Sequence, residues 1–175
     1  MILIHDKYFT PFISASEIDS AINKIASEMM DDLDDVPIFV GVLNGSFMFV
    51  SDFIKHYTKP CEVSFIKVSS YQGTSSTQRV NHLIGLNTSI KGRTVVLLED
   101  IIDTGNTIEV LEKLFQEQGV KSLKIATLFF KPEAYKKQVK IDYIGIEIPN
   151  KFIVGYGLDY NEQGRNLPEI YQLKQ

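Results

Sequence analysis

Three acidic residues and a glycine-containing turn stand together in one stretch of the chain. Glu99 and Asp100 follow directly on the apolar run 94–98, and Asp103 comes soon after them. The small polar segment 104–107 then leads into an amphipathic helical pattern. Because an apolar strand that ends in carboxylates is costly to bury unless something polar lies beside it, this stretch predicts a polar ligand.

The turn after these acids has the composition of a phosphate site. The first N–H groups of a helix have no partner within it, and the helix dipole favours negative charge there. Gly105 lets the backbone approach a phosphate closely, and Thr104 and Thr107 add hydroxyl donors. Carboxylates beside a phosphate can bind sugar hydroxyls, hold Mg²⁺ or move a proton. An isolated Asp-Thr-Gly would more simply be a helix cap, but the whole stretch favours a ligand site.

The rest of the chain predicts the elements that must position this stretch. Ser14 and Glu17 have the spacing of a capping box, and apolar residues follow at helical intervals to Met29. Further helices are predicted over 46–55 and 107–118, and strands over 38–43, 62–71, 80–86, 94–98, 124–130, 142–146 and 152–154. Strands that alternate with helices predict an α/β fold with a mostly parallel central sheet flanked by helices. Segments 62–71 and 80–86 predict a hairpin that lies, with the C-terminal strands, at the sheet edge or in an accessory flap.

Composition limits the class of protein. A chain of 175 residues fits one domain, which we place over 1–175. A formal charge of −4 argues against nucleic acid as a partner, because phosphate neutralisation needs a basic face. Cys61 is the sole cysteine, so no disulfide forms within the chain and a reducing compartment is expected. No apolar run approaches the ~20 residues that span a bilayer, and no signal peptide is evident, so we expect a cytoplasmic protein without membrane partners.

The segment Leu98 to Gly105 resembles the motif of type I phosphoribosyltransferases that binds phosphoribosyl pyrophosphate (PRPP), in the form found in the hypoxanthine–guanine branch. The resemblance implies that Glu99 and Asp100 bind the ribose hydroxyls of PRPP. It also implies that Asp103 is the catalytic residue, acting as general base or acid at the purine N7. The implied set for the ribose and 5′-phosphate is Glu99, Asp100, Asp103, Thr104, Gly105, Asn106 and Thr107. Asn106 stands where some members of the family have lysine.

A second group of residues resembles the family's purine site. Lys131 follows the strand 124–130 at the position of the lysine that hydrogen-bonds the purine 6-oxo group. Segment 150–162 matches the family's C-terminal signature. This match implies that Phe152 stacks on the purine and that the backbone at Ile153 meets its polar edge. It also implies that Asp159 is one of the purine-binding residues and lies beside the metal-bound pyrophosphate, which Arg165 binds.

Two loops complete the resemblance. Asn44 and Gly45 correspond to the family's pyrophosphate loop, with a non-proline cis peptide expected between Leu43 and Asn44. Many members have lysine where this chain has Asn44, so the loop lacks one charged contact with pyrophosphate. Ser70 and Tyr71 correspond to the start of a mobile hairpin lid that closes over the reacting centre.

The resemblance implies both a fold and a reaction. The fold is that of type I phosphoribosyltransferases, with a small hood or flap built from the N- and C-terminal segments. The reaction is the Mg²⁺-dependent transfer of the 5-phosphoribosyl group from PRPP to N9 of hypoxanthine or guanine, which gives IMP or GMP and pyrophosphate. Glu99, Asp100 and Asp159 are the implied ligands of Mg²⁺. A homodimer or homotetramer is the implied assembly.

Two other functions stay open at this point. A phosphoribosyltransferase for adenine, orotate or uracil is opposed by Lys131 and by the segment around Phe152. A regulator of the same fold that binds PRPP or nucleotide without catalysis is opposed by the acidic charge and by the intact acidic motif. The preference among hypoxanthine, guanine and xanthine is open, because these bases differ at the purine 2-position.

Overall fold

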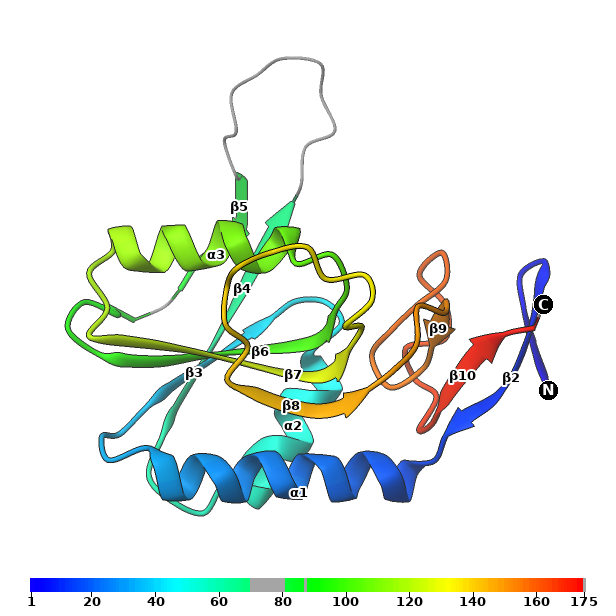
Figure 1. Cartoon of the computed structure of the whole chain (residues 1–175), viewed down its shortest axis with the longest axis horizontal. Helices are drawn as coiled ribbons and strands as arrows, with labels where there is room; N and C mark the ends of the chain where they lie inside the picture. Colours follow the sequence, from blue (N-terminus) through cyan, green and yellow to red (C-terminus); the bar gives the residue numbers. More distant parts are fainter. Residues whose placement is uncertain (70–80, 87, 175) are drawn as a thin grey trace.

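In the computed structural model, which describes residues 1–69, 81–86 and 88–174, two separate β-sheets share the chain (Figure 1). The central sheet has the strand order β5-β4-β3-β6-β7-β8. Its strands are β3 (Ile38–Val42), β4 (Glu62–Ser69), β5 (Asn81–Ile84), β6 (Thr94–Ile102), β7 (Ser122–Phe130) and β8 (Tyr143–Glu147). β5 runs antiparallel to β4, and the other neighbours are parallel. The predicted α/β fold with a mostly parallel sheet is confirmed, as is the pairing of the two hairpin strands.

Helices cover both faces of the central sheet. α1 (Ala15–Asp32) and α2 (Phe47–His56) pack on one face, and α3 (Asn106–Glu117) lies on the other (Figure 1). Successive residues of a strand point to opposite faces, so Val96 and Leu98 pack under α1 and α2 while Val95 and Leu97 pack under α3. Burial on both faces explains why the central strands are continuously apolar.

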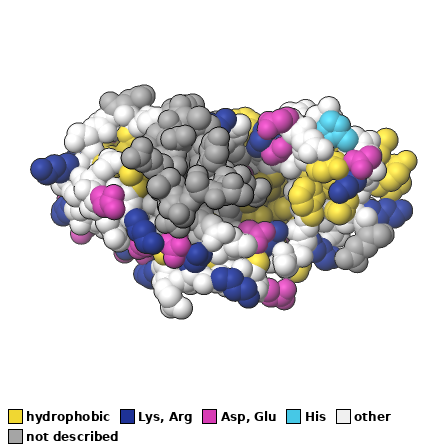
Figure 2. All heavy atoms as spheres, turned by 90° about the horizontal axis from the view of Figure 1, so that it is seen from above, with side chains coloured by type: hydrophobic (Ala, Val, Ile, Leu, Met, Phe, Trp, Pro, Cys, Tyr) yellow, Lys and Arg dark blue, Asp and Glu magenta, His cyan; other side chains and the backbone are white. Residues whose placement is uncertain are grey.

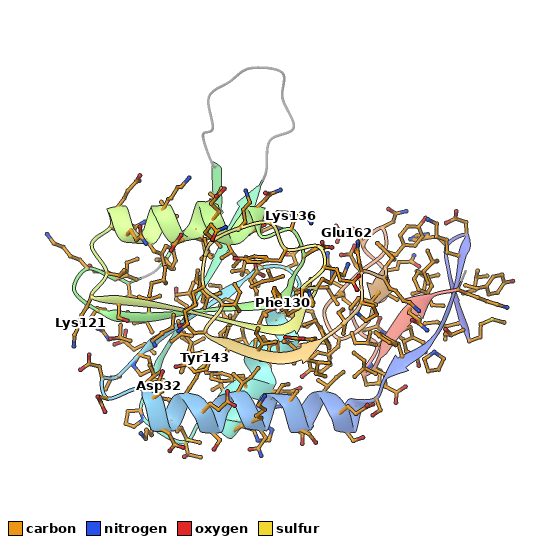
Figure 3. All side chains as sticks on the ribbon, in the orientation of Figure 1. Asp32, Lys121, Phe130, Lys136, Tyr143 and Glu162 are labelled. Atoms are coloured by element: carbon orange, nitrogen blue, oxygen red, sulfur yellow. The ribbon has the colours of Figure 1, made fainter. Side chains whose placement is uncertain are left out.

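The predicted start of the first helix is correct in detail. The Ser14 side chain accepts from the backbone N–H of Glu17, and the Glu17 carboxylate accepts from the backbone N–H of Ser14. This reciprocal capping box satisfies donors that the first turn of a helix leaves unpaired. At the other end of α1, the Tyr143 hydroxyl donates to Asp32, which joins the helix to β8 (Figure 3).

β6 is longer than the sequence predicted. The apolar run suggested a strand over 94–98, but β6 continues to Ile102 because its pairing with β7 continues, with Ile102 opposite Phe130. Its pairing with β3 ends earlier, at the pair of Gly41 with Leu98. Glu99 and Asp100 therefore lie inside the strand rather than after it, on a segment with a strand neighbour on one side.

The N- and C-terminal segments form the second sheet, where the sequence predicted a flap built from these segments. This terminal sheet has the order β1-β2-β10-β9 and is antiparallel throughout. Its strands are β1 (Ile2–Ile4), β2 (Lys7–Ile13), β9 (Ile153–Val154) and β10 (Ile170–Leu173). It stands at the end of the molecule toward which β6 and β7 point, and it carries both chain termini (Figure 1). Among the described helices, none is long and apolar enough to cross a membrane.

Candidate active site

The predicted site residues come from segments that meet at the carboxyl ends of β3, β6 and β7. Open α/β sheets bind ligands outside this edge. Figure 3 shows Lys136 and Glu162 at this end of the central sheet and Lys121 at the opposite end. The first turn of α3, the loop after β3 and the segment between β9 and β10 all reach the same end (Figure 1).

Glu99 and Asp100 are two buried, adjacent carboxyl groups within β6. Their exposed fractions are 6% and 9%. The backbone N–H of Ile101 donates to Asp100 Oδ1 at 2.9 Å. Burial raises the pKa of Asp100 to about 6, although this hydrogen bond acts in the opposite direction. Burial and the neighbouring Asp100 carboxylate raise the pKa of Glu99 well above its ordinary range. Such a pair is costly in a folded protein unless a polar or cationic ligand uses it.

The loop after β3 packs directly on Asp100. The peptide bond between Leu43 and Asn44 is cis, as the resemblance predicted. A Cβ atom added to Gly45 would lie 1.6 Å from Asp100 Oδ2, so no residue larger than glycine fits without displacement of the carboxylate. A Cβ atom added to Gly157 would lie 2.0 Å from the carbonyl oxygen of Gly45. The loop at Gly45 therefore lies between the Asp100 carboxylate and the segment around Gly157.

The turn before α3 encloses a small hollow. Gly105 adopts φ +84° as the N-cap of α3, and it has no side chain that could occupy the free N–H groups of the first turn. The hollow measures about 110 Å³ and is lined by Glu99 and residues 101–108. It contains every residue predicted to bind the ribose and 5′-phosphate except Asp100. Tyr135 and Lys137 close one side of Gly105, because an added Cβ atom there would lie 2.4 and 2.8 Å from their side chains.

Lys131 and Asp103 form an ion pair. The Lys131 Nζ donates to Asp103 Oδ2 at 2.8 Å. The lysine side chain is 9% exposed, whereas the aspartate side chain is 44% exposed. The backbone N–H of Lys131 donates to the carbonyl of Ile102, which fixes the lysine beside the end of β6. A buried ammonium and a more accessible carboxylate thus stand side by side at the mouth of the site.

Phe152 presents an exposed aromatic ring beside the terminal sheet. Its exposed fraction is 46%, and its ring centroid lies 6.3 Å from that of Phe9 and 5.9 Å from that of Tyr160. Its carbonyl accepts from the N–H of Leu173, and the next residue, Ile153, is buried. Figure 2 shows hydrophobic side chains gathered at the end of this face formed by the terminal sheet. A ring anchored on one side and open on the other suits a planar ligand that stacks on it.

Arg165 and Asp159 pair with each other. Arg165 Nη2 lies 2.7 Å from Asp159 Oδ1 and 3.4 Å from Glu162 Oε2, and Nη1 donates to the carbonyl of Gly157. The second oxygen of Asp159 accepts from the backbone N–H of Glu162. The carboxylate that was predicted to hold a metal with Glu99 and Asp100 therefore has both oxygens engaged.

The predicted three-carboxylate metal site is not assembled. Over the described ranges 1–69, 81–86 and 88–174, no group of three or more His, Cys, Asp and Glu side chains is placed to hold a metal ion. The Asp159 carboxylate is paired with Arg165 and does not form a group with the Glu99 and Asp100 carboxylates of β6. Glu99 and Asp100 still offer hard oxygen donors of the type that Mg²⁺ accepts.

Two of the predicted site residues lie outside the described part of the chain, and three residues that contact the site were not predicted from the sequence. Ser70 and Tyr71, the predicted lid residues, lie outside the described residues. Tyr135 and Lys137, which cover Gly105, carry no local signal in the sequence. The same holds for Lys67, whose Nζ donates to Asn44 Oδ1 at 3.0 Å from the neighbouring strand β4.

Comparison with known proteins places these features in a family. Residues 14–161 match the family model described as the phosphoribosyl transferase domain. The chain is 43% identical over 164 residues to the hypoxanthine-guanine phosphoribosyltransferase of Bacillus subtilis, with 93% of this chain and 91% of that protein covered. It superimposes with a TM-score of 0.88 on two crystal structures. One is a hypoxanthine-guanine phosphoribosyltransferase from Bacillus anthracis, at 35% identity over 94% of this chain and 98% of that one. The other is a hypoxanthine phosphoribosyltransferase from Staphylococcus aureus, at 38% identity over 94% and 91%.

Proposed function

We propose that this chain, which belongs to the phosphoribosyl transferase family, acts in purine salvage as a hypoxanthine-guanine phosphoribosyltransferase. It transfers the 5-phosphoribosyl group of PRPP to N9 of hypoxanthine or guanine and gives IMP or GMP and pyrophosphate. The relatives of that name match across nine-tenths of both chains, so the likeness extends far beyond one motif.

The ion pair between Lys131 and Asp103 is the observation that supports this base preference most directly. In the N7–H tautomer of a free 6-oxopurine, O6 is an acceptor that a cation can recognise, and the adjacent N7–H is a donor that a carboxylate can accept. Lys131 donates to O6, and Asp103, its ion-pair partner, accepts from N7–H. Adenine presents an amino donor in place of O6, and a buried ammonium opposes that donor.

Each of the remaining groups of the site binds a different part of the two substrates. The hollow before α3 receives the 5′-phosphate on the free N–H groups of the first turn, with Thr104 and Thr107 as hydroxyl donors. Glu99 and Asp100 accept from the ribose hydroxyls. Phe152 stacks on the purine, the backbone at Ile153 meets its polar edge, and Arg165 turns from Asp159 to pyrophosphate. Asp103 holds the proton at N7 while N9 displaces pyrophosphate from C1′.

Mg²⁺ is the metal that we propose for this reaction. The two carboxyl oxygen donors on β6, close to where phosphates bind, suit a hard cation that takes one or two carboxylates together with substrate oxygens. When bound, the ion neutralises charge that grows on the leaving pyrophosphate. Asp159 becomes available to the bound pyrophosphate and its metal once Arg165 moves away from it.

The proposed assembly is a homodimer or homotetramer, and the proposed compartment is the cytoplasm. Cys61 is a free thiol, which suits a reducing compartment. Sedimentation of the protein as a monomer would overturn the proposed assembly.

Nucleotide formation from PRPP and Mg²⁺ tests the proposed function. Hypoxanthine, guanine, xanthine and adenine are supplied in parallel, and product is followed by absorbance or chromatography. We expect IMP and GMP from the first two bases and no AMP. Product with adenine alone would contradict the role of Lys131, and PRPP binding without product from any base would favour a regulator.

A further inference from the structure

We propose that Lys67, on β4, binds the pyrophosphate group of PRPP and supplies from the neighbouring strand the cation that the loop 43–46 lacks. This inference rests on the proposed function and deepens it, because it adds a binding residue to the same reaction. It starts from a contact that no motif contains, the hydrogen bond from Lys67 Nζ to Asn44 Oδ1 at 3.0 Å.

The backbone holds Lys67 beside the loop. β3 and β4 are parallel, and their pairing runs to Val42 opposite Ile66. The N–H of Leu43 then donates to the carbonyl of Ile66 at 2.8 Å, so the two chains stay together up to the first residue of the loop. Lys67 is the next residue of β4, and its half-buried side chain extends to Asn44.

Lys67 differs from the other cations described at the site in its partner. Lys131 is paired with Asp103, Lys137 with Glu109, and Arg165 with Asp159. Within the part of the chain that the structure describes, no carboxylate oxygen lies within 4.0 Å of Lys67 Nζ, which meets a neutral amide oxygen. An ammonium has three donors, so this contact leaves donors and a full positive charge for an anion.

The surroundings indicate which anion this is. The next residue, Gly45, lies against Asp100 and against Gly157, whose carbonyl accepts from Arg165. Lys67 and Arg165 therefore approach the same loop from different elements. The 5′-phosphate hollow lies elsewhere, at the first turn of α3. The phosphorylated group left for the loop is the diphosphate of PRPP, which gains negative charge as it leaves C1′.

Equilibrium binding to wild type and Lys67→Gln tests the inference, with PRPP, inorganic pyrophosphate and IMP as ligands in the presence of Mg²⁺. Loss of one charge-assisted hydrogen bond predicts that PRPP and pyrophosphate bind about 10-fold more weakly. IMP carries the purine and the 5′-phosphate but no pyrophosphate, so its affinity should not change. Lys24→Gln removes the same charge from the exposed face of α1 and is the matched control. Asn44→Lys in the Lys67→Gln chain returns a cation to the loop and should restore most of the pyrophosphate affinity.

The outcomes separate this inference from the proposed function. A selective loss for PRPP and pyrophosphate supports it. Unchanged affinities in Lys67→Gln overturn the inference alone, as long as wild type binds PRPP and forms IMP. An equal loss for all three ligands would show a structural role and also overturn it. A wild-type protein that binds neither PRPP nor pyrophosphate would overturn both proposals together.

Discussion

Asp100→Asn should make the ligand-free protein more stable at neutral pH while it weakens PRPP binding. Burial raises the pKa of Asp100 from its ordinary value of 3.8 to about 6. A carboxyl group whose pKa is higher in the folded than in the unfolded state destabilises the fold once it ionises. The difference between the two pKa values corresponds to about 3 kcal/mol in the free energy of unfolding, at about 1.36 kcal/mol for each unit of pKa. An amide oxygen can still accept from the N–H of Ile101, so the substitution removes the charge and keeps this contact.

The gain should depend on pH in a definite direction. Well below pH 3.8 the carboxyl group is protonated in both states, so wild type and Asp100→Asn should be equally stable. As pH rises from 3.8 to about 6, the group ionises in the unfolded state before it ionises in the folded state, so wild type becomes less stable relative to the variant. The difference should be complete near pH 8. Removal of the charge also lowers the cost of ionising Glu99 beside it, which acts in the same direction.

Thermal unfolding between pH 4.5 and 8 measures this difference. For a chain of this size, about 3 kcal/mol corresponds to roughly 6 to 12 °C in Tm at pH 8. Asp34→Asn makes the same chemical change on an exposed aspartate in the loop after α1 and is the control. A variant that is less stable than wild type at pH 8, or a gain that does not shrink toward pH 4.5, would refute the argument from burial.

Three further substitutions test the site. Asp103→Asn should keep the fold, because its amide oxygen can still accept from Lys131, and should lose roughly 10²- to 10⁴-fold in turnover, the usual effect of a positioned acid or base; wild-type turnover would remove Asp103 from the mechanism. Lys131→Ala should raise the KM for hypoxanthine by about 10- to 100-fold through loss of a charge-assisted hydrogen bond, with the KM for PRPP changed much less; an unchanged purine KM would show a different role. Gly45→Ala should lower both PRPP affinity and Tm, because its methyl group meets Asp100, whereas Gly85→Ala has open space around it and should change neither. Equal behaviour of the two alanine variants would contradict the close packing on Asp100.

Local sequence patterns predicted most helices and strands, but pairing between distant strands decides where some of the strands end. The capping box at Ser14 predicted the start of α1, because every atom involved lies within four residues. The end of β6 could not be predicted in this way. Its last four residues are strand because β7 pairs with them, and that partner lies more than twenty residues away in sequence. β2 was missed because Pro11 and polar residues interrupt its pattern, and the strand depends on β10 at the other end of the chain, with a register shift opposite Pro11.

The same distinction between local patterns and long-range contacts applies to the residues of the site. The acids and the turn from Glu99 to Thr107 are contiguous, so the sequence predicts them as one ligand site, and the structure gathers most of them around one hollow. Contacts between distant segments carry no such signal. Neither the approach of Lys67 to Asn44 nor the hold of Arg165 on Asp159 follows from spacing.

In the ligand-free site, Lys131 is paired with Asp103 and Arg165 with Asp159. The first of these ion pairs bears on which purine the site selects. In the proposed reaction, a 6-oxopurine that takes the ammonium of Lys131 would offer a new acceptor in place of Asp103, and its N7–H would donate to Asp103. The broken ion pair is then replaced at both ends. Adenine would separate the same pair and give Lys131 a donor, which leaves a buried ammonium, 9% exposed, without an acceptor. Sites that leave a polar group unpaired reject the wrong ligand far more strongly than sites that merely lose an apolar contact. On the proposed role of Lys131, the ion pair would thus make the cost of binding adenine larger than the loss of one hydrogen bond.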